Sequence, residues 1–201
     1  MKKLGILLSG RGSNFEAITR NVREGKLAAE IAVVISNRPE APGLETARRL
    51  GLNAVAIPSK GMDREAFDAL VSAELERHGV DLVCLAGYMR LLSAAFVRRF
   101  PMRILNIHPS LLPAFPGLDA QHQAFDYGVK VSGCTVHFVD EQLDHGPIVL
   151  QSAVNVLPGD TAETLSARIR AEEHRIYSEA IRLVLAGSVR VEGRRIIVEA
   201  S

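Results

Sequence analysis

The first half of the chain alternates short apolar runs with longer amphipathic segments. Apolar residues at helical spacing in the amphipathic segments predict helices, and the leucine-rich and β-branched runs between them predict buried strands. This alternation is typical of parallel βαβ units, so it predicts an α/β fold built on an open, doubly wound, mostly parallel sheet. The predicted strands are LGILL, EIAVVIS, AVAI and DLVCLAG, and the helices between them are NFEAITRNVREG, GLETARRLG and DREAFDALVSAELERHG.

Glycines and prolines mark the ends of these elements. Gly25, Gly51 and Gly79 each follow an amphipathic segment, at the position where many helices end in a left-handed residue. The segment HPSLLPAFPG, residues 108–117, contains three prolines and has neither a helical nor a strand period. It therefore predicts an ordered loop.

After this loop the pattern becomes that of a hairpin and one long helix. Two strand-like runs over 131–139 and 147–156 flank a polar segment, which predicts an antiparallel hairpin at the edge of the sheet. A long amphipathic pattern over 161–187 predicts a helix that Thr161 or Asp160 caps. The remaining predicted elements are helices over 93–100 and 120–127, a strand over 103–108, and a tail hairpin over 188–199 that turns at Glu192 and Gly193.

Length and charge narrow the class of protein. The 201 residues predict a single domain over 1–201 with its core in 3–185. The 24 basic and 23 acidic residues give a net charge of +1, which argues against nucleic acid or an anionic membrane as a partner. No apolar run approaches the ~20 residues that span a bilayer, and the run at Leu4–Leu8 is too short for a signal peptide. Cys84 and Cys134 lie in apolar runs, which predicts buried, non-catalytic thiols in the reducing cytoplasm.

A glycine-rich loop is the first candidate site, because ligands of open parallel sheets bind beyond the carboxyl ends of strands. Arg11, Gly12, Ser13 and Asn14 follow the first predicted strand and open the first helix. Free backbone N–H groups and the helix dipole at such a place favour a phosphate. The alternative is an ordinary tight turn in which Ser13 caps the helix. Phe15 stands where a dinucleotide fingerprint needs glycine, and no lysine of a P-loop is present, so a monophosphate is favoured.

Asn106 and His108 form the second candidate site. They lie two residues apart at the end of a predicted strand, so their side chains face the same way. An amide donor beside an imidazole can stabilise the charge that builds on a carbonyl oxygen under nucleophilic attack. The alternative is structural, with a capping histidine and an asparagine that bonds loop backbone.

Asp144 is the third candidate, in the acidic segment between the two strands of the predicted hairpin. Most charges of this segment are expected to be solvated, but Gly146 and Pro147 restrict the backbone just after Asp144. A carboxylate held there could orient an imidazole or accept a proton from an attacking amine. His78, His122, His137 and His174 are given structural places on helices or strands, and no zinc-binding spacing is present in the sequence.

Four segments resemble the phosphoribosylglycinamide formyltransferase family, in order from Lys3 to about Leu185. They are LLSGRGSNFEAI, AGYMRLLS, NIHPSLLPAFPGLDAQHQA and VHFVDEQLDHGPIVLQ. The HPSLLP-x-x-x-G element alone marks the broader group of folate formyltransferases and hydrolases, and its combination with SGxGSN is more specific. The chain departs from some relatives at Ala114 and at 119–122, which puts individual roles for Asp119 and His122 in doubt.

The resemblance implies a Rossmann-like fold and an activity. The formyl group of 10-formyltetrahydrofolate would pass to the amine of 5'-phosphoribosylglycinamide in de novo purine biosynthesis, without a metal. Asn106, His108 and Asp144 would be catalytic: protonated His108 and the Asn106 amide stabilise the oxyanion, and Asp144 keeps His108 charged and helps carry the amine proton. Gly12, Ser13 and Asn14 would hold the ribose phosphate, with Glu173 near the amine and ribose. The residues implied for folate are Arg64, Met89, Arg90, Leu91, Leu92, Val139 and Asp140.

Three rivals remain open beside this activity. Methionyl-tRNA formyltransferase and formyltetrahydrofolate hydrolase (deformylase) share the HPSLLP loop, but we expect both to be longer than 201 residues. A folate- or phosphate-binding module without activity is the non-enzyme alternative, against which the retained amide, imidazole and carboxylate argue. The sequence is compatible with a monomer or a homodimer.

Overall fold

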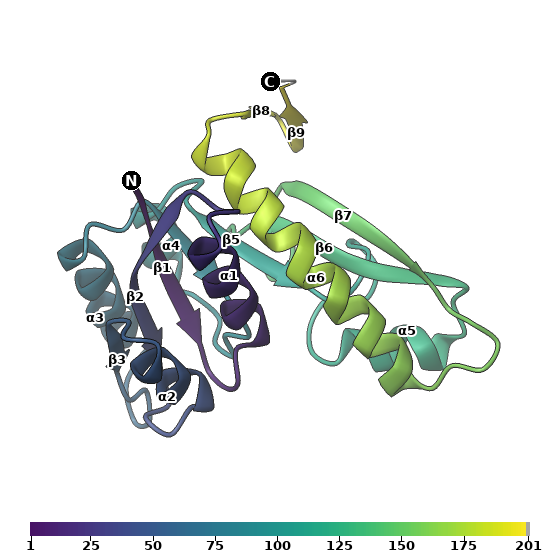
Figure 1. The fold of residues 1–201 in the computed structure, drawn as a ribbon, viewed down its shortest axis with the longest axis horizontal. Coiled ribbons are helices and arrows are strands. Elements are labelled where there is room, and N and C mark those ends of the chain that lie inside the picture. The colour runs from purple at the N-terminus through teal and green to yellow at the C-terminus, as the bar shows by residue number, and fades with distance from the viewer. Residues whose placement is uncertain (200–201) are drawn as a thin grey trace. The chain divides into compact units, whose positions relative to one another are not determined.

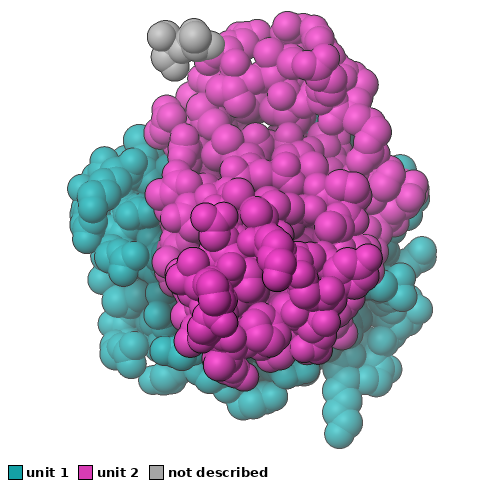
Figure 2. Space-filling view, turned by 90° about the vertical axis from the view of Figure 1, so that its right-hand side faces the viewer, with its two compact units in different colours: residues 1–105 teal, residues 106–201 magenta. Residues whose placement is uncertain are grey.

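The computed structural model describes residues 1–199 and divides the chain into two compact units, which meet in sequence at Leu105 and Asn106 (Figure 2). Each unit has its own internal packing. The single domain over 1–201 stays a prediction. None of the helices within residues 1–199 is long and apolar enough to cross a membrane.

The first unit is built on parallel strands, as the alternating pattern predicts. β1 pairs in parallel with β2 and with β4, and β2 pairs in parallel with β3, which gives the order β3-β2-β1-β4. The helices that connect parallel strands lie on the faces of the sheet, so the interiors of these strands are buried. The bounds are β1 (Lys2–Leu8), α1 (Ser13–Arg23), β2 (Ala29–Ser36), α2 (Pro42–Arg49), β3 (Ala54–Ala56), α3 (Arg64–Arg77), β4 (Leu82–Leu85) and α4 (Ala94–Arg99).

The predicted helix ends in this unit are confirmed. Gly25, Gly51 and Gly79 have φ values of 71°, 70° and 65°, each one residue after a helix cap. Only a residue without Cβ adopts this left-handed conformation at low cost. β5 (Ile104–His108) then crosses the sequence division between the two units.

The second unit is an antiparallel pair of strands with a long helix packed against it. β6 (Val131–Phe138) and β7 (Ile148–Asn155) pair from Val131 opposite Asn155 onward, which confirms the predicted hairpin. α6 (Ala162–Leu185) lies along β6 and β7 (Figure 1), and α5 (Ala120–Tyr127) packs against α6. Thr161, one of the two predicted caps, begins α6 in a capping box with Thr164.

The predicted tail hairpin also exists and extends this sheet. β8 (Val189–Glu192) and β9 (Arg195–Val198) pair antiparallel, with Gly193 and Arg194 in the turn between them. β9 pairs in parallel with β7 at Ile148 and Arg195, so β8 is the outermost strand of the second unit. The 131–156 hairpin is therefore followed by one further hairpin at the edge.

Candidate active site

The strand order of the first unit creates a place for ligands where β1 and β4 lie side by side. The chain winds outward from β1 to β2 and β3, and then returns to β4 on the other side. In open α/β sheets ligands bind at the carboxyl ends of the strands at such a switch point. Ser9, just after β1, accepts a hydrogen bond from the Met89 N–H (2.8 Å) and donates one to Asn37 Oδ1 (2.6 Å). The predicted phosphate loop and the predicted folate segment 89–92 therefore follow neighbouring strands, β1 and β4, and the hydrogen bond between Met89 and Ser9 links them.

The glycine-rich loop leaves the first N–H groups of α1 without a side-chain cap among the described residues. Gly12 is the N-cap in the left-handed conformation, and Ser13 is already helical, so the alternative reading of Ser13 as the cap is wrong. The Gly43 N–H donates to the Gly10 carbonyl (3.0 Å), and a Cβ at residue 43 would lie 2.9 Å from that oxygen. Glycine at residue 43 therefore lets the start of α2 lie close to the glycine-rich loop. The uncapped helix start suits an anion.

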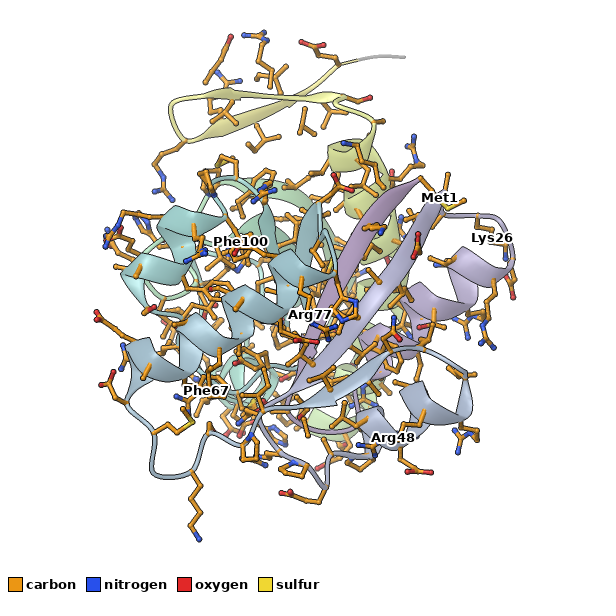
Figure 3. All side chains as sticks on the ribbon, turned by 90° about the vertical axis from the view of Figure 1, so that its left-hand side faces the viewer. Met1, Lys26, Arg48, Phe67, Arg77 and Phe100 are labelled. Carbon is orange, nitrogen blue, oxygen red and sulfur yellow. The ribbon has the colours of Figure 1, made fainter. Side chains whose placement is uncertain are left out.

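The predicted folate residues of the first unit combine exposed apolar side chains with a packed arginine. Met89 and Leu91 are 58% and 52% exposed, whereas the Arg90 guanidinium lies 4.4 Å from the ring centre of Phe67. Phe67 is a residue of α3 (Figure 3). Arg64 is the first residue of α3. Exposed methionine and leucine beside a strand end could cover a flat aromatic ligand.

The second unit brings the predicted catalytic residues together. Asn106 and His108 lie at the end of β5 and Asp144 in the loop after β6. His108 Nδ1 lies 3.5 Å from Asp144 Oδ2, and both side chains are almost completely buried. His108 Nε2 donates to the Phe115 carbonyl at 2.8 Å. Both ring nitrogens therefore face oxygen acceptors, an arrangement that suits an imidazolium.

The Asp144 carboxylate is held by backbone as well as by His108. Its Oδ2 accepts a hydrogen bond from the Gly117 N–H at 2.8 Å. Asp144 and Phe115 both adopt left-handed backbone, with φ of 49° and 50°, a strained conformation that gathers at functional sites. A Cβ at Gly146 would lie 1.9 Å from the Phe138 carbonyl oxygen, so glycine lets the loop pass tightly over the end of β6.

His137 is a residue of this cluster that the sequence argument placed only as a strand residue. Its Nδ1 donates to the Phe138 carbonyl (2.8 Å), so its Nε2 accepts from Asn106 Nδ2 at 3.2 Å. Asp144 Oδ1 lies 3.8 Å from His137 Nε2. Burial lowers the pKa of His137, outweighing the Phe138 hydrogen bond and the Asp144 charge that raise it. His137 is the penultimate residue of β6, and that place at a strand's carboxyl end is the signal that could have found it.

The model of the formyl transferase family matches residues 2–181. The chain belongs to the formyl transferase family. This confirms the resemblance drawn from the four sequence segments.

Three relatives show how far the similarity of this formyl transferase extends. The chain is 47% identical over 190 residues to the trifunctional purine biosynthetic protein adenosine-3 of Bos taurus, covering 94% of the chain but only 19% of that protein. It is 43% identical to phosphoribosylglycinamide formyltransferase of Bacillus subtilis, covering 92% of this chain and 95% of that one. A crystal structure of glycinamide ribonucleotide transformylase 1 from Symbiobacterium toebii is 56% identical with a TM-score of 0.97, covering 100% and 95% of the two chains.

Other predicted site residues of this formyl transferase have structural partners of their own. Asp140 Oδ2 lies 2.7 Å from His145 Nδ1, and Oδ1 accepts from the Gln142 N–H, so this carboxylate organises the loop. Val139 precedes it directly after β6, and Glu173 is buried on α6.

Burial raises the pKa of the Cys134 thiol to about 12, which makes it inert. Within residues 1–199 no group of three His, Cys, Asp or Glu is arranged to hold a metal ion.

A pocket of about 380 Å³ opens beside Asp144 in the second unit. Its walls combine apolar residues of the 108–117 loop with the acidic loop and the tail hairpin. Its lining residues include Leu112, Pro113, Leu143, Asp144, His145 and Arg194.

Proposed function

We propose that this chain transfers the formyl group of 10-formyltetrahydrofolate to the amine of 5'-phosphoribosylglycinamide. The products are the N-formyl compound and tetrahydrofolate, and the reaction is a step of de novo purine biosynthesis in the cytoplasm. The formyl transferase family and the names of the relatives support the reaction class. The buried free thiols Cys84 and Cys134 suit a reducing compartment.

The observation that carries the proposal is the cluster of Asn106, His108 and Asp144. The side chains of His108 and Asp144 are buried 3.5 Å apart, and His137 lies between Asn106 and Asp144. An amide, an imidazole and a carboxylate gathered in this way can supply an oxyanion donor, a cation and a proton acceptor. A module that only binds folate or phosphate has no need for a carboxylate buried beside two histidines, since burying a charge costs free energy unless it is paired.

The hydrogen bonds support the following role for each group in the proposed reaction. The substrate amine attacks the formyl carbon, and the carbonyl oxygen becomes an oxyanion that accepts hydrogen bonds from His108 Nδ1–H and from the second Asn106 Nδ2–H. Asp144 accepts the proton of the amine, directly or through water. The oxyanion then re-forms the carbonyl as the bond from the formyl carbon to the folate nitrogen breaks, and that nitrogen takes up the proton that Asp144 accepted. The His108 Nε2 bond to Phe115 keeps Nδ1 turned toward Asp144.

The other residues singled out in the sequence would bind the two substrates. We propose that the glycine-rich loop, Arg11, Gly12, Ser13 and Asn14, holds the substrate phosphate on the uncapped start of α1. Glu173 would contact the amine and ribose. Arg64, the 89–92 segment, Val139 and Asp140 would bind the folate, with Met89 and Leu91 offering apolar surface.

The experiment is a spectroscopic assay of purified protein with both substrates beside a reaction that contains the formyl folate alone. Formation of tetrahydrofolate only when phosphoribosylglycinamide is present, together with the N-formyl product, is the expected result. Equal folate turnover without the amine would identify a formyltetrahydrofolate hydrolase instead. Tight folate binding without turnover in either reaction would identify a binding module.

A further inference from the structure

The tail hairpin, to which the proposed function gives no role, touches the loop that carries Asp144. Arg194 lies in the turn between β8 and β9, and its Nη2 donates to the His145 carbonyl at 2.5 Å. That carbonyl belongs to the residue immediately after Asp144. The contact thus reaches the backbone of the loop.

The same guanidinium also contacts the His145 ring. Arg194 Nη1 lies 3.0 Å from His145 Nε2 and 3.3 Å from Nδ1, so it rests against the ring. His145 Nδ1 in turn lies 2.7 Å from Asp140 Oδ2. A relay of contacts therefore runs from Arg194 through His145 to Asp140, and the last two residues lie on either side of Asp144 in the sequence.

Asp144 has an uncommon backbone conformation that contacts on both sides hold in place. Its φ of 49° is left-handed, a conformation that few residues other than glycine, asparagine and aspartate adopt. On one side of Asp144, Gly146 is pressed against Phe138. On the other, the relay fixes Asp140. Arg194 and Asp144 also line the same pocket.

We propose that Arg194 is a positioning residue, which holds the 140–146 loop so that the Asp144 carboxylate stays directed at His108. The guanidinium suits this task because its planar fork can bond the His145 carbonyl through one nitrogen and lie against the His145 ring through the other. β9 is anchored beside the loop by its pairing with β7 at Ile148 and Arg195. The tail hairpin therefore acts on the reaction without touching the reacting atoms.

The test compares three variants of the full chain: Arg194→Ala, Arg194→Lys and, as a matched control, Arg190→Ala. Arg190 lies in the same hairpin but pairs with Glu192 and Glu199. Arg194→Ala is expected to lower kcat by about tenfold to a hundredfold, as misplacement of a reacting group does, with KM for the phosphorylated substrate nearly unchanged. The lysine variant keeps one donor and recovers part of the loss, and Arg190→Ala behaves as wild type.

A second measurement does not depend on activity, and so separates this inference from the proposed function on which its kinetic readout rests. The Gly117 N–H donates to Asp144 Oδ2, so its hydrogen exchange by NMR reports whether the carboxylate is in place. Faster exchange in Arg194→Ala but not in Arg190→Ala supports positioning, even if the wild type proves to transfer no formyl group. Wild-type kcat in Arg194→Ala with unchanged Gly117 exchange, or equal losses in both variants, would overturn it.

Discussion

At the scale of single residues, the two histidines of the site are set up for opposite tasks. His108 has an oxygen acceptor at each ring nitrogen, whereas His137 donates to Phe138 and accepts from Asn106. The first arrangement suits a cation, and the second needs a neutral ring. One imidazole can thus stabilise an oxyanion while the other orients the amide that assists it.

Asp144→Asn tests the charge at this cluster. The amide still accepts from Gly117 and tolerates the left-handed backbone, so the free energy of unfolding should change by less than about 1 kcal/mol. The lost proton acceptor should lower kcat on the order of a hundredfold to ten-thousandfold. The matched control is Asp119→Asn, which makes the same exchange at another left-handed position (φ 58°) on an exposed side chain. Steady-state kinetics with wild-type turnover in Asp144→Asn would remove this carboxylate from the mechanism.

The lowered pKa of His137 predicts a pH dependence of stability. Burial holds the folded pKa below the unfolded value of 6.5, so below that pH the unfolded chain binds the proton first. The free energy of unfolding should therefore fall as pH drops below about 6.5, by at most ~1.4 kcal/mol per pH unit, until the folded pKa is reached. Urea unfolding of wild type and His137→Gln between pH 8 and pH 5 measures the difference. Parallel pH curves for the two proteins would contradict the shifted pKa.

At the scale of elements, the periodicity of apolar residues predicts the strands and helices, but it does not predict the contacts that orient the site. Alternating apolar runs were enough for the strands and helices, and Gly25, Gly51 and Gly79 for three helix ends. Strand-end position and resemblance predict Asn106, His108 and Asp144 as a catalytic trio. His108 and Asp144 lie 3.5 Å apart, and the catalytic role of the three stays a prediction. His137 and Arg194 were given no role, because their partners are distant in sequence and no local spacing reports such contacts.

Gly146 is a single residue that determines the path of a whole loop, because the loop has no room for a Cβ at this position. Gly146→Ala would place a carbon 1.9 Å from the Phe138 carbonyl oxygen, so the loop must shift or β6 must yield. We expect a loss of about 1–3 kcal/mol in the free energy of unfolding, as for overpacking, and a fall in kcat because Asp144 moves with the loop. Gly159→Ala is the matched control, with nothing within 4 Å of its Cβ. Equal stability and activity in the two variants, by urea unfolding and kinetics, would show that the loop path does not depend on Gly146.

At the scale of the whole molecule, the balance of charge decides how an anionic substrate is captured. A net charge of +1 creates no general field that would draw a phosphate toward the protein. Affinity for a phosphorylated substrate must then come from local geometry, and the proposed place is the start of α1, just after β1. A single change of backbone there should remove most of the binding.

Gly12→Ala tests that dependence, and Gly10→Ala in the same loop is its control. Gly12 has φ of 72° and a Cβ there would lie 3.0 Å from Leu8 Cδ2, whereas a Cβ at Gly10 meets nothing within 4 Å. In wild type and in Gly10→Ala, phosphoribosylglycinamide at a hundred times its Kd should stabilise the fold by about 2.7 kcal/mol, seen as a rise in Tm. Gly12→Ala should lose most of that rise, because the strained loop can no longer present the first N–H groups of α1. A full rise in Tm for Gly12→Ala would mean that the phosphate binds elsewhere, and the glycine-rich loop would then be only a turn between β1 and α1.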